Sequence, residues 1–108
     1  MKENEAMLQI DVDYDVWDEN YELDEERLSS VRNNIERAFA EFYKANEHKV
    51  KEVFVSGSEI SFVTDKKNVK PFSDYFMKKT SKAKFVTRIE VFVIEKKKIY
   101  DKKIEKKD

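Results

Sequence analysis

Hydrophobic residues follow first the period of a strand and then that of a helix, in an order that restricts how this chain can fold. Every second residue from 8 to 16 is apolar, which predicts a half-buried strand. Apolar residues three and four apart from 28 to 42 predict an amphipathic helix. Strand patterns return at 53–63 and 85–95, and a short helix is predicted between them at 71–79. The chain therefore has the pattern of an α+β domain.

The order strand, helix, strand, strand, helix, strand is that of the split βαβ or ferredoxin-like motif. We expect an antiparallel sheet with two helices on one face and the ferredoxin-like order βαββαβ. One long helix packed on an antiparallel meander is the alternative. Residues 1–95 form the single predicted α+β domain, and residues 96–108 are a lysine-rich edge strand or tail.

Local signals set the expected ends of these elements. Asp24 is a suitable N-cap, and acidic residues follow it in the first turn, so the first helix is predicted over 25–47. The segment 56–59 predicts a hairpin turn, with one long strand bulged at Gly57 as the alternative. Pro71 predicts the start of the second helix, because a missing N–H is tolerated in the first turn.

Composition excludes several classes of function. Cys is absent, which excludes a disulfide framework, a Cys-ligated metal site and a thiol nucleophile. The chain has one Gly and one Pro, too few for a glycine-rich phosphate loop. No apolar run reaches the ~20 residues that span a bilayer, and the N-terminal residues lack a signal-peptide core. We expect a cytoplasmic location, with no membrane partner, cofactor or metal.

The N-terminal quarter is strongly acidic although the whole chain is nearly neutral. Residues 1–26 contain eleven acids and one lysine, for a net charge of −10, whereas the net charge of the chain is −1. The remaining 82 residues contain 21 Lys and Arg against 12 acids. This asymmetry predicts either two surfaces of opposite charge or neutralisation of the acidic end by the basic end within the molecule.

The acidic segment predicts a protein-binding surface. Asp11, Asp13 and Asp15 alternate with apolar residues, which places them on one strand face at intervals of ~6.7 Å. Such a face suits a basic partner, because opposite potentials speed encounter and set orientation. We expect an inhibitor, immunity or adaptor type of module, although a solvated face neutralised by its own neighbours explains the same charges. The predicted partner-binding residues are Asp11, Asp13, Asp15, Trp17, Asp18, Glu19 and Glu22.

The same segment resembles an EF-hand calcium loop. Asp occupies the first, third and fifth positions from Asp11, and Glu22 occupies the twelfth. The sixth position, where that loop requires glycine, is Val16. The alternating strand pattern accounts for the apolar residues as well as the acids, so we predict no metal site here.

The lysine-rich second half predicts an alternative function. Clustered lysines give sequence-independent affinity for nucleic acid through counterion release. Phe72, Tyr75 and Phe76 lie among these lysines, although their helical spacing is also that of core residues. The predicted nucleic-acid-binding residues are Lys66, Lys67, Lys70, Lys78, Lys79, Lys82 and Lys84.

The sequence gives little support to catalysis. His48 is the only histidine, and a cation near the end of the first helix is explained by the helix dipole. No serine has the context of an activated nucleophile, so we predict a non-enzymatic protein.

The strand predicted at 85–95 is apolar on both faces. An apolar patch opposite the helices would be covered by a second copy of the chain, by a partner or by a strand from the C-terminal segment. The residues predicted for this patch are Trp17, Val86, Phe92 and Ile94.

Overall fold

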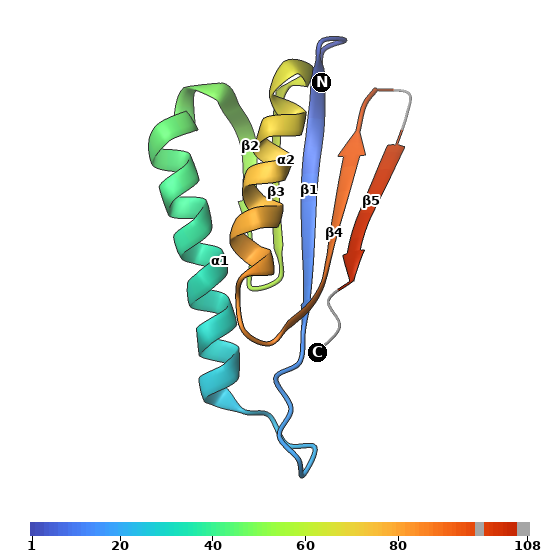
Figure 1. Cartoon of the computed structure of the whole chain (residues 1–108). Coiled ribbons are helices and arrows are strands. Elements are labelled where there is room, and N and C mark those ends of the chain that lie inside the picture. The colour runs from blue at the N-terminus through green and yellow to red at the C-terminus, as the bar shows by residue number, and fades with distance from the viewer. Residues whose placement is uncertain (97–98, 106–108) are drawn as a thin grey trace.

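Two helices cover one face of an antiparallel sheet in the computed structural model, which describes residues 1–96 and 99–105 (Figure 1). This arrangement confirms the predicted α+β class with both helices on one face. The elements are β1 (Glu5–Tyr14), α1 (Glu25–Asn46), the 3-10 turn η1 (Glu47–Lys49), β2 (Val50–Val55), β3 (Glu59–Asp65), α2 (Lys66–Ser81), β4 (Val86–Ile94) and β5 (Ile99–Glu105).

The strand order in the sheet is β2-β3-β1-β4-β5, and every neighbouring pair is antiparallel. Strands β1 and β2 therefore run parallel with β3 between them, and β3 and β4 run parallel with β1 between them. A meander would place consecutive strands side by side throughout, so this order excludes the meander alternative. The ferredoxin-like name remains our interpretation of this order.

Residues 99–105 of the C-terminal segment form the edge strand β5. It pairs with β4 along its whole length, from Ile94 opposite Ile99 to Arg88 opposite Glu105. The other residues of the predicted tail, 97, 98 and 106–108, lie outside the described residues.

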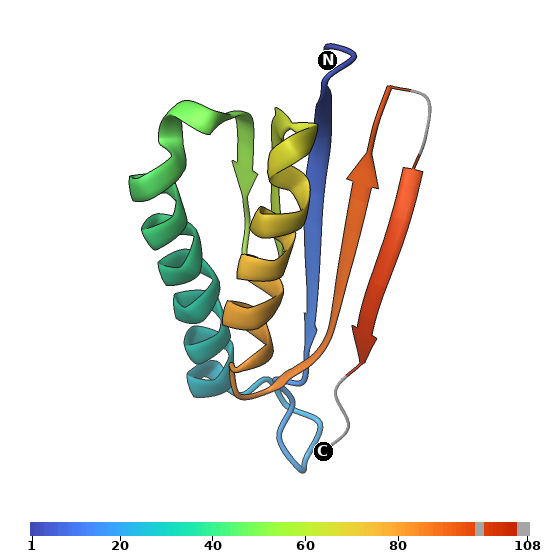
Figure 2. The same cartoon turned by 45° about the horizontal axis from the view of Figure 1, so that its top comes forward.

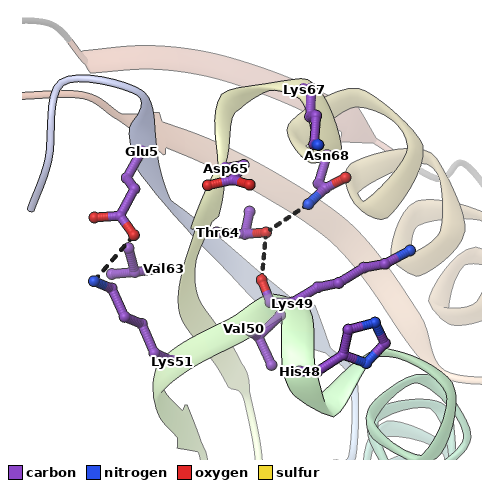
Figure 3. Close-up of a pocket in the computed structure, with 10 residues that line it drawn as sticks. All are labelled: Glu5, His48, Lys49, Val50, Lys51, Val63, Thr64, Asp65, Lys67 and Asn68. Carbon is purple, nitrogen blue, oxygen red and sulfur yellow. Dashed lines mark hydrogen bonds and ion pairs between the residues drawn. The ribbon is translucent and has the colours of Figure 1, made fainter.

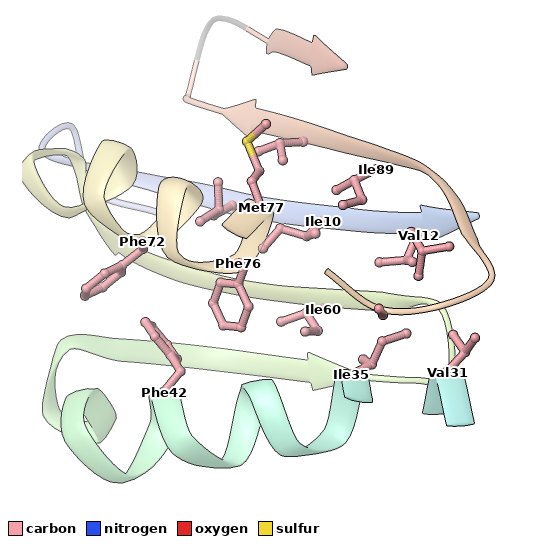
Figure 4. Packing of buried hydrophobic residues seen from close by; sticks show 14 of the residues in the cluster. Ile10, Val12, Val31, Ile35, Phe42, Ile60, Phe72, Phe76, Met77 and Ile89 are labelled. Carbon is pink, nitrogen blue, oxygen red and sulfur yellow. The ribbon is translucent and has the colours of Figure 1, made fainter. Parts of the chain in front are cut away.

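Phe42 of α1 joins both helices to the sheet (Figure 4). Its ring centroid lies 5.2 Å from that of Phe62 in β3, and 4.8 and 4.7 Å from those of Phe72 and Phe76 in α2. Each such side chain stabilises the fold by about 1.5–3 kcal/mol through burial. Other fully buried residues of this core are Leu8, Ile10, Val31, Ile35, Ile60 and Ile89.

The N-cap and the hairpin predicted from the sequence are both confirmed. The Asp24 carboxylate accepts hydrogen bonds from the backbone N–H groups of Glu26 and Arg27, each at 3.1 Å. Strands β2 and β3 are joined by a tight turn in which the N–H of Ser56 donates to the carbonyl of Glu59 at 2.8 Å. These bonds fix the start of α1 and the turn of the hairpin.

Helix α2 begins at Lys66, and the predicted start at Pro71 is wrong. Pro71 lies inside the helix, where it removes one backbone hydrogen bond. Val69 already packs against the core, so burial begins before the proline and favours helix there. Burial of Val69 therefore determines the start of the helix more strongly than the preference of proline for the first helical turn.

A β-bulge between β1 and β4 changes the faces predicted for β4. Asp13 lies opposite Arg88 and Tyr14 lies opposite Val86, so Thr87 is an extra residue in β4. Because of this residue, Val86 lies on the helix side of the sheet, where it is 2% exposed.

The predicted apolar patch is therefore wrong in two of its four residues. Val86 belongs to the core, and Trp17 lies beyond the end of β1. Phe92 and Ile94 are half-buried on the open face, by which we mean the sheet face opposite the helices.

Candidate functional site

The β1–α1 loop, residues 15–24, projects beyond the end of the sheet and the helices (Figures 1 and 2). Its backbone folds back on itself, with Trp17 bridged to Leu23. The N–H of Asp18 donates to the carbonyl of Glu22 at 2.8 Å, and the N–H of Tyr21 donates to the carbonyl of Asp18 at 3.0 Å. The loop is therefore held in a defined shape.

The Asp18 carboxylate has a structural role in this loop. Its Oδ1 accepts from the backbone N–H groups of Asn20 at 2.8 Å and Glu22 at 3.0 Å. These bonds stabilise a turn in which Tyr21 has a positive φ of 61°. One oxygen of the predicted partner-binding Asp18 is thus already used inside the loop.

Arg27, in the first turn of α1, holds the base of the loop. Its Nη1 donates to the carbonyl of Trp17 at 3.1 Å, and its Nε lies 3.3 Å from Asp24 Oδ2. Its guanidinium lies 4.9 Å from the centroid of the Phe85 ring. The carbonyl of Phe85 accepts from the N–H of Asp15 at 2.7 Å, so both ends of the loop are tied to the folded domain.

Three large apolar side chains are exposed on this short loop. Trp17 is 53% exposed, Tyr21 is 90% exposed and Leu23 is 42% exposed. Burying such side chains is a main source of binding free energy, and aromatic residues are enriched in interfaces. The sequence predicted Trp17 as an anchor but gave no signal for Tyr21 and Leu23.

The acids of the N-terminal segment divide into a neutralised set and an unpaired set. Ion pairs join Arg88 to Asp13, Lys51 to Glu5, Lys96 to Glu3 and Arg27 to Asp24. Internal neutralisation therefore applies to part of the segment, and most of the unpaired acids lie in the loop or in the first turn of α1. The acids of the loop and that turn with no ion-pair partner among the described residues are Asp15, Asp18, Glu19, Glu22, Glu25 and Glu26.

The predicted ladder of three aspartates is wrong at its third member. Asp11 and Asp13 lie on the open face, but β1 ends at Tyr14 after the bulge, and Asp15 belongs to the loop. Asp13 is bound at 3.0 Å by Arg88. The twelve residues that resemble a calcium loop are thus a strand followed by a loop, with no entering helix.

Asp11 lies between two further acids that the sequence pattern does not reveal. The register places it opposite Glu59 of β3 and opposite Glu90 of β4. Burial and the neighbouring charge of Asp11 raise the pKa of Glu59. This row depends on strand pairing, so no sequence spacing could have indicated it.

A hollow of about 470 Å³ lies at the opposite end of β1 from the loop (Figure 3). Lys51 lies 3.0 Å from Glu5, and hydrogen bonds from a Lys2 N–H and from Lys51 lower the pKa of Glu5. The residues that line the hollow come from distant parts of the sequence, and the sequence did not predict this site. The lining residues are Glu5, His48, Lys49, Val50, Lys51, Val63, Thr64, Asp65, Lys67 and Asn68.

The predicted nucleic-acid-binding lysines lie on α2 and just after it. Lys66, Lys70 and Lys79 form ion pairs with Glu95, Asp74 and Glu41, respectively. The aromatic residues among them face the core, where Tyr75 donates to the carbonyl of Ala38 at 3.3 Å. The predicted lysines with no ion-pair partner in the described part of the chain are Lys67, Lys78, Lys82 and Lys84.

Neither the arrangement of metal-binding side chains in the described residues nor similarity to known proteins assigns this chain a function. Within residues 1–96 and 99–105, no group of three or more His, Asp and Glu side chains is arranged to hold a metal ion. No helix among the described residues combines the length and apolar character needed to cross a membrane. No protein-family model, curated protein or solved structure matches the chain.

Proposed function

We propose that this chain is a small non-enzymatic protein-binding module of the inhibitor or adaptor type. It docks the β1–α1 loop onto a basic surface of a partner protein. The observation that carries the proposal is that one ordered loop combines three exposed apolar side chains with acids that have no ion-pair partner among the described residues. A cytoplasmic location, expected from the cysteine-free composition, is part of this proposal.

The internal bonds of the loop support this function. A loop that is already ordered loses less conformational entropy on binding than a flexible one. Trp17 and Tyr21 can then supply apolar contact while the surrounding carboxylates steer a basic partner and reject acidic ones. The acids at the rim contribute mainly to association rate, so binding should weaken as salt rises.

A capture experiment with matched variants tests the proposal. The tagged chain is incubated with lysate of its source organism at low salt, with and without nuclease, and eluted by a salt gradient. Wild type is compared with Trp17→Ala/Glu22→Gln, which changes the loop, and with Tyr43→Ala/Glu36→Gln, which changes exposed side chains of α1.

A basic protein that survives nuclease, is retained by the control variant and is lost by the loop variant would support the proposal. Retention by the loop variant equal to wild type would contradict it. When the captured protein is purified, it must bind the purified wild type and the control variant more tightly than the loop variant.

The unpaired lysines on and after α2 favour nucleic-acid binding as a second candidate. Lys67, Lys78 and Lys82 are exposed and have no ion-pair partner among the described residues. The aromatic side chains of α2 pack in the core and do not lie on the surface with these lysines. Nucleic-acid bases would therefore find no aromatic side chain to stack on there. Nuclease-sensitive capture that Lys78→Glu/Lys82→Glu abolishes would favour this candidate.

A further inference from the structure

We propose that the basic partner of the β1–α1 loop is a second copy of this chain. The loop of one copy would enter the hollow at the far end of the next copy. This inference rests on the proposed function, because it names the partner of the same loop.

The loop supplies the apolar and acidic half of this contact. Trp17, Tyr21 and Leu23 are exposed, and Glu19 and Glu22 beside them have no ion-pair partner among the described residues. The loop needs a recess with an apolar floor and a cationic rim.

The hollow supplies such a recess. Half-buried Val50 and almost fully buried Val63 contribute its apolar lining, and Lys49 and Lys67 are exposed with no ion-pair partner in the described part of the chain. His48 also lines it. The volume of about 470 Å³ is in the range of sites that accept a large side chain or a small ligand.

The acids of the hollow cancel only part of this charge. Glu5 is already paired with Lys51 at 3.0 Å, and Asp65 accepts a hydrogen bond from Asn4 Nδ2 at 3.4 Å. The lining contains three lysines and two acids, a net charge of +1. The hollow is therefore complementary in charge to the loop.

The two surfaces cannot meet within one molecule. Glu5 lines the hollow at the start of β1, and the loop follows the end of this ten-residue strand. Such a strand is about 33 Å long. A contact between the loop and the hollow must therefore join two copies. It can close into a reciprocal dimer or a ring, or leave a free loop and a free hollow at the ends of an open chain of copies.

The contact should be weak and sensitive to salt. One loop tip buries less surface than a stable dimer interface, so association at micromolar to millimolar concentration is expected. In about 1 M salt the screening length falls to about 3 Å, which removes most of the attraction between exposed charges.

The test uses two variants that each lack one half of the contact. Trp17→Ala/Glu22→Gln removes two of the loop contacts and keeps the hollow, and Lys49→Glu/Lys67→Glu reverses the rim of the hollow and keeps the loop. Lys78→Glu/Lys82→Glu is the matched control, with the same charge change elsewhere on α2 and after it. The solution mass of each protein is measured by sedimentation over a range of concentrations.

At low salt, the mass of wild type and of the control should rise above 13.0 kDa with concentration. Each half-contact variant alone should associate about tenfold or more weakly. An equimolar mixture of the two should form a dimer and stop there, because only one intact loop and one intact hollow remain to pair.

Three outcomes would overturn the inference: a wild type that stays monomeric at all concentrations and salts, a mixture that forms no dimer, or association lost in the control as well. Circular dichroism of each variant establishes that it is folded. Loop-dependent capture of another basic protein by a monomeric chain would leave the proposed function standing without this inference.

Discussion

The Nη1 of Arg27 donates to the carbonyl oxygen of Trp17 at 3.1 Å. A residue of α1 therefore holds the backbone of Trp17, whose indole side chain is exposed. The same guanidinium contacts Asp24 and lies over Phe85. One side chain therefore connects the start of α1, the loop and the segment before β4. The exposed Trp17 is held in place through its backbone rather than by packing of its side chain.

Replacement of Arg27 by Met should loosen the loop and leave the core intact. The lost hydrogen bond and the partly exposed ion pair should lower the free energy of unfolding by only about 1 kcal/mol. Partner binding should fall more than this, because the loop must then be ordered on binding. Amide hydrogen exchange at residues 17–24 should accelerate by more than the roughly fivefold that a global loss of about 1 kcal/mol allows in β1. Equal acceleration in both would contradict a local role.

Replacement of Phe42 by Ala should destabilise the whole domain. Its ring contacts residues of β3 and α2, so truncation leaves a cavity and should cost about 3–5 kcal/mol. Tyr43→Ala is the control, because Tyr43 is 38% exposed and should cost far less. Urea unfolding curves measure both. Similar midpoints for the two variants would show that Phe42 is not at the centre of the core.

Replacement of Glu59 by Gln should stabilise the protein at neutral pH. The pKa of Glu59 is raised in the folded state by burial and by Asp11, so ionised Glu59 disfavours folding. The penalty disappears as pH falls through the ordinary pKa of a glutamate and the group becomes protonated in both states. Thermal unfolding across pH should show a gain at pH 7 that vanishes in acid. A gain independent of pH would contradict this origin.

Replacement of Glu5 by Gln should have the opposite effect. The folded state lowers the pKa of Glu5 through hydrogen bonds from Lys2 and Lys51, so ionised Glu5 favours folding. This stability is present above the unfolded pKa and is lost as pH falls through the folded value. The variant should be less stable than wild type at pH 7, and the two should converge in acid. The same pH series measures both glutamate variants.

Periodicity and capping predicted the elements that local sequence determines. The period of two at β1, the spacing of the buried residues in α1 and the cap at Asp24 depend on neighbours within a few residues. They could therefore be recognised without knowledge of the rest of the fold. The hairpin between β2 and β3 belongs to the same class.

Features set by strand pairing could not be predicted in this way. The extra residue Thr87 is visible only when β4 is placed beside β1, and it moves Val86 into the core. The row of Asp11 with Glu59 and Glu90 requires the register of three strands.

The candidate site was predicted in part. The acids and Trp17 were recognised from charge and alternation, but the sequence assigned Asp15 to a strand that ends at Tyr14. The exposure of Tyr21 depends on a turn held by Asp18, and the hollow depends on segments far apart in the chain.

Fluorine NMR of the single tryptophan tests the central claim most directly. Trp17 is the only Trp, so biosynthetic fluorotryptophan gives one resonance that reports from the loop itself. Our account predicts that this resonance shifts or broadens when partner protein, or further copies of the chain, are added at low salt. It should return to its starting position in about 1 M salt, where exposed charges are screened. A partner that binds the chain while the Trp17 resonance stays unchanged would contradict the assignment of the β1–α1 loop as the docking surface.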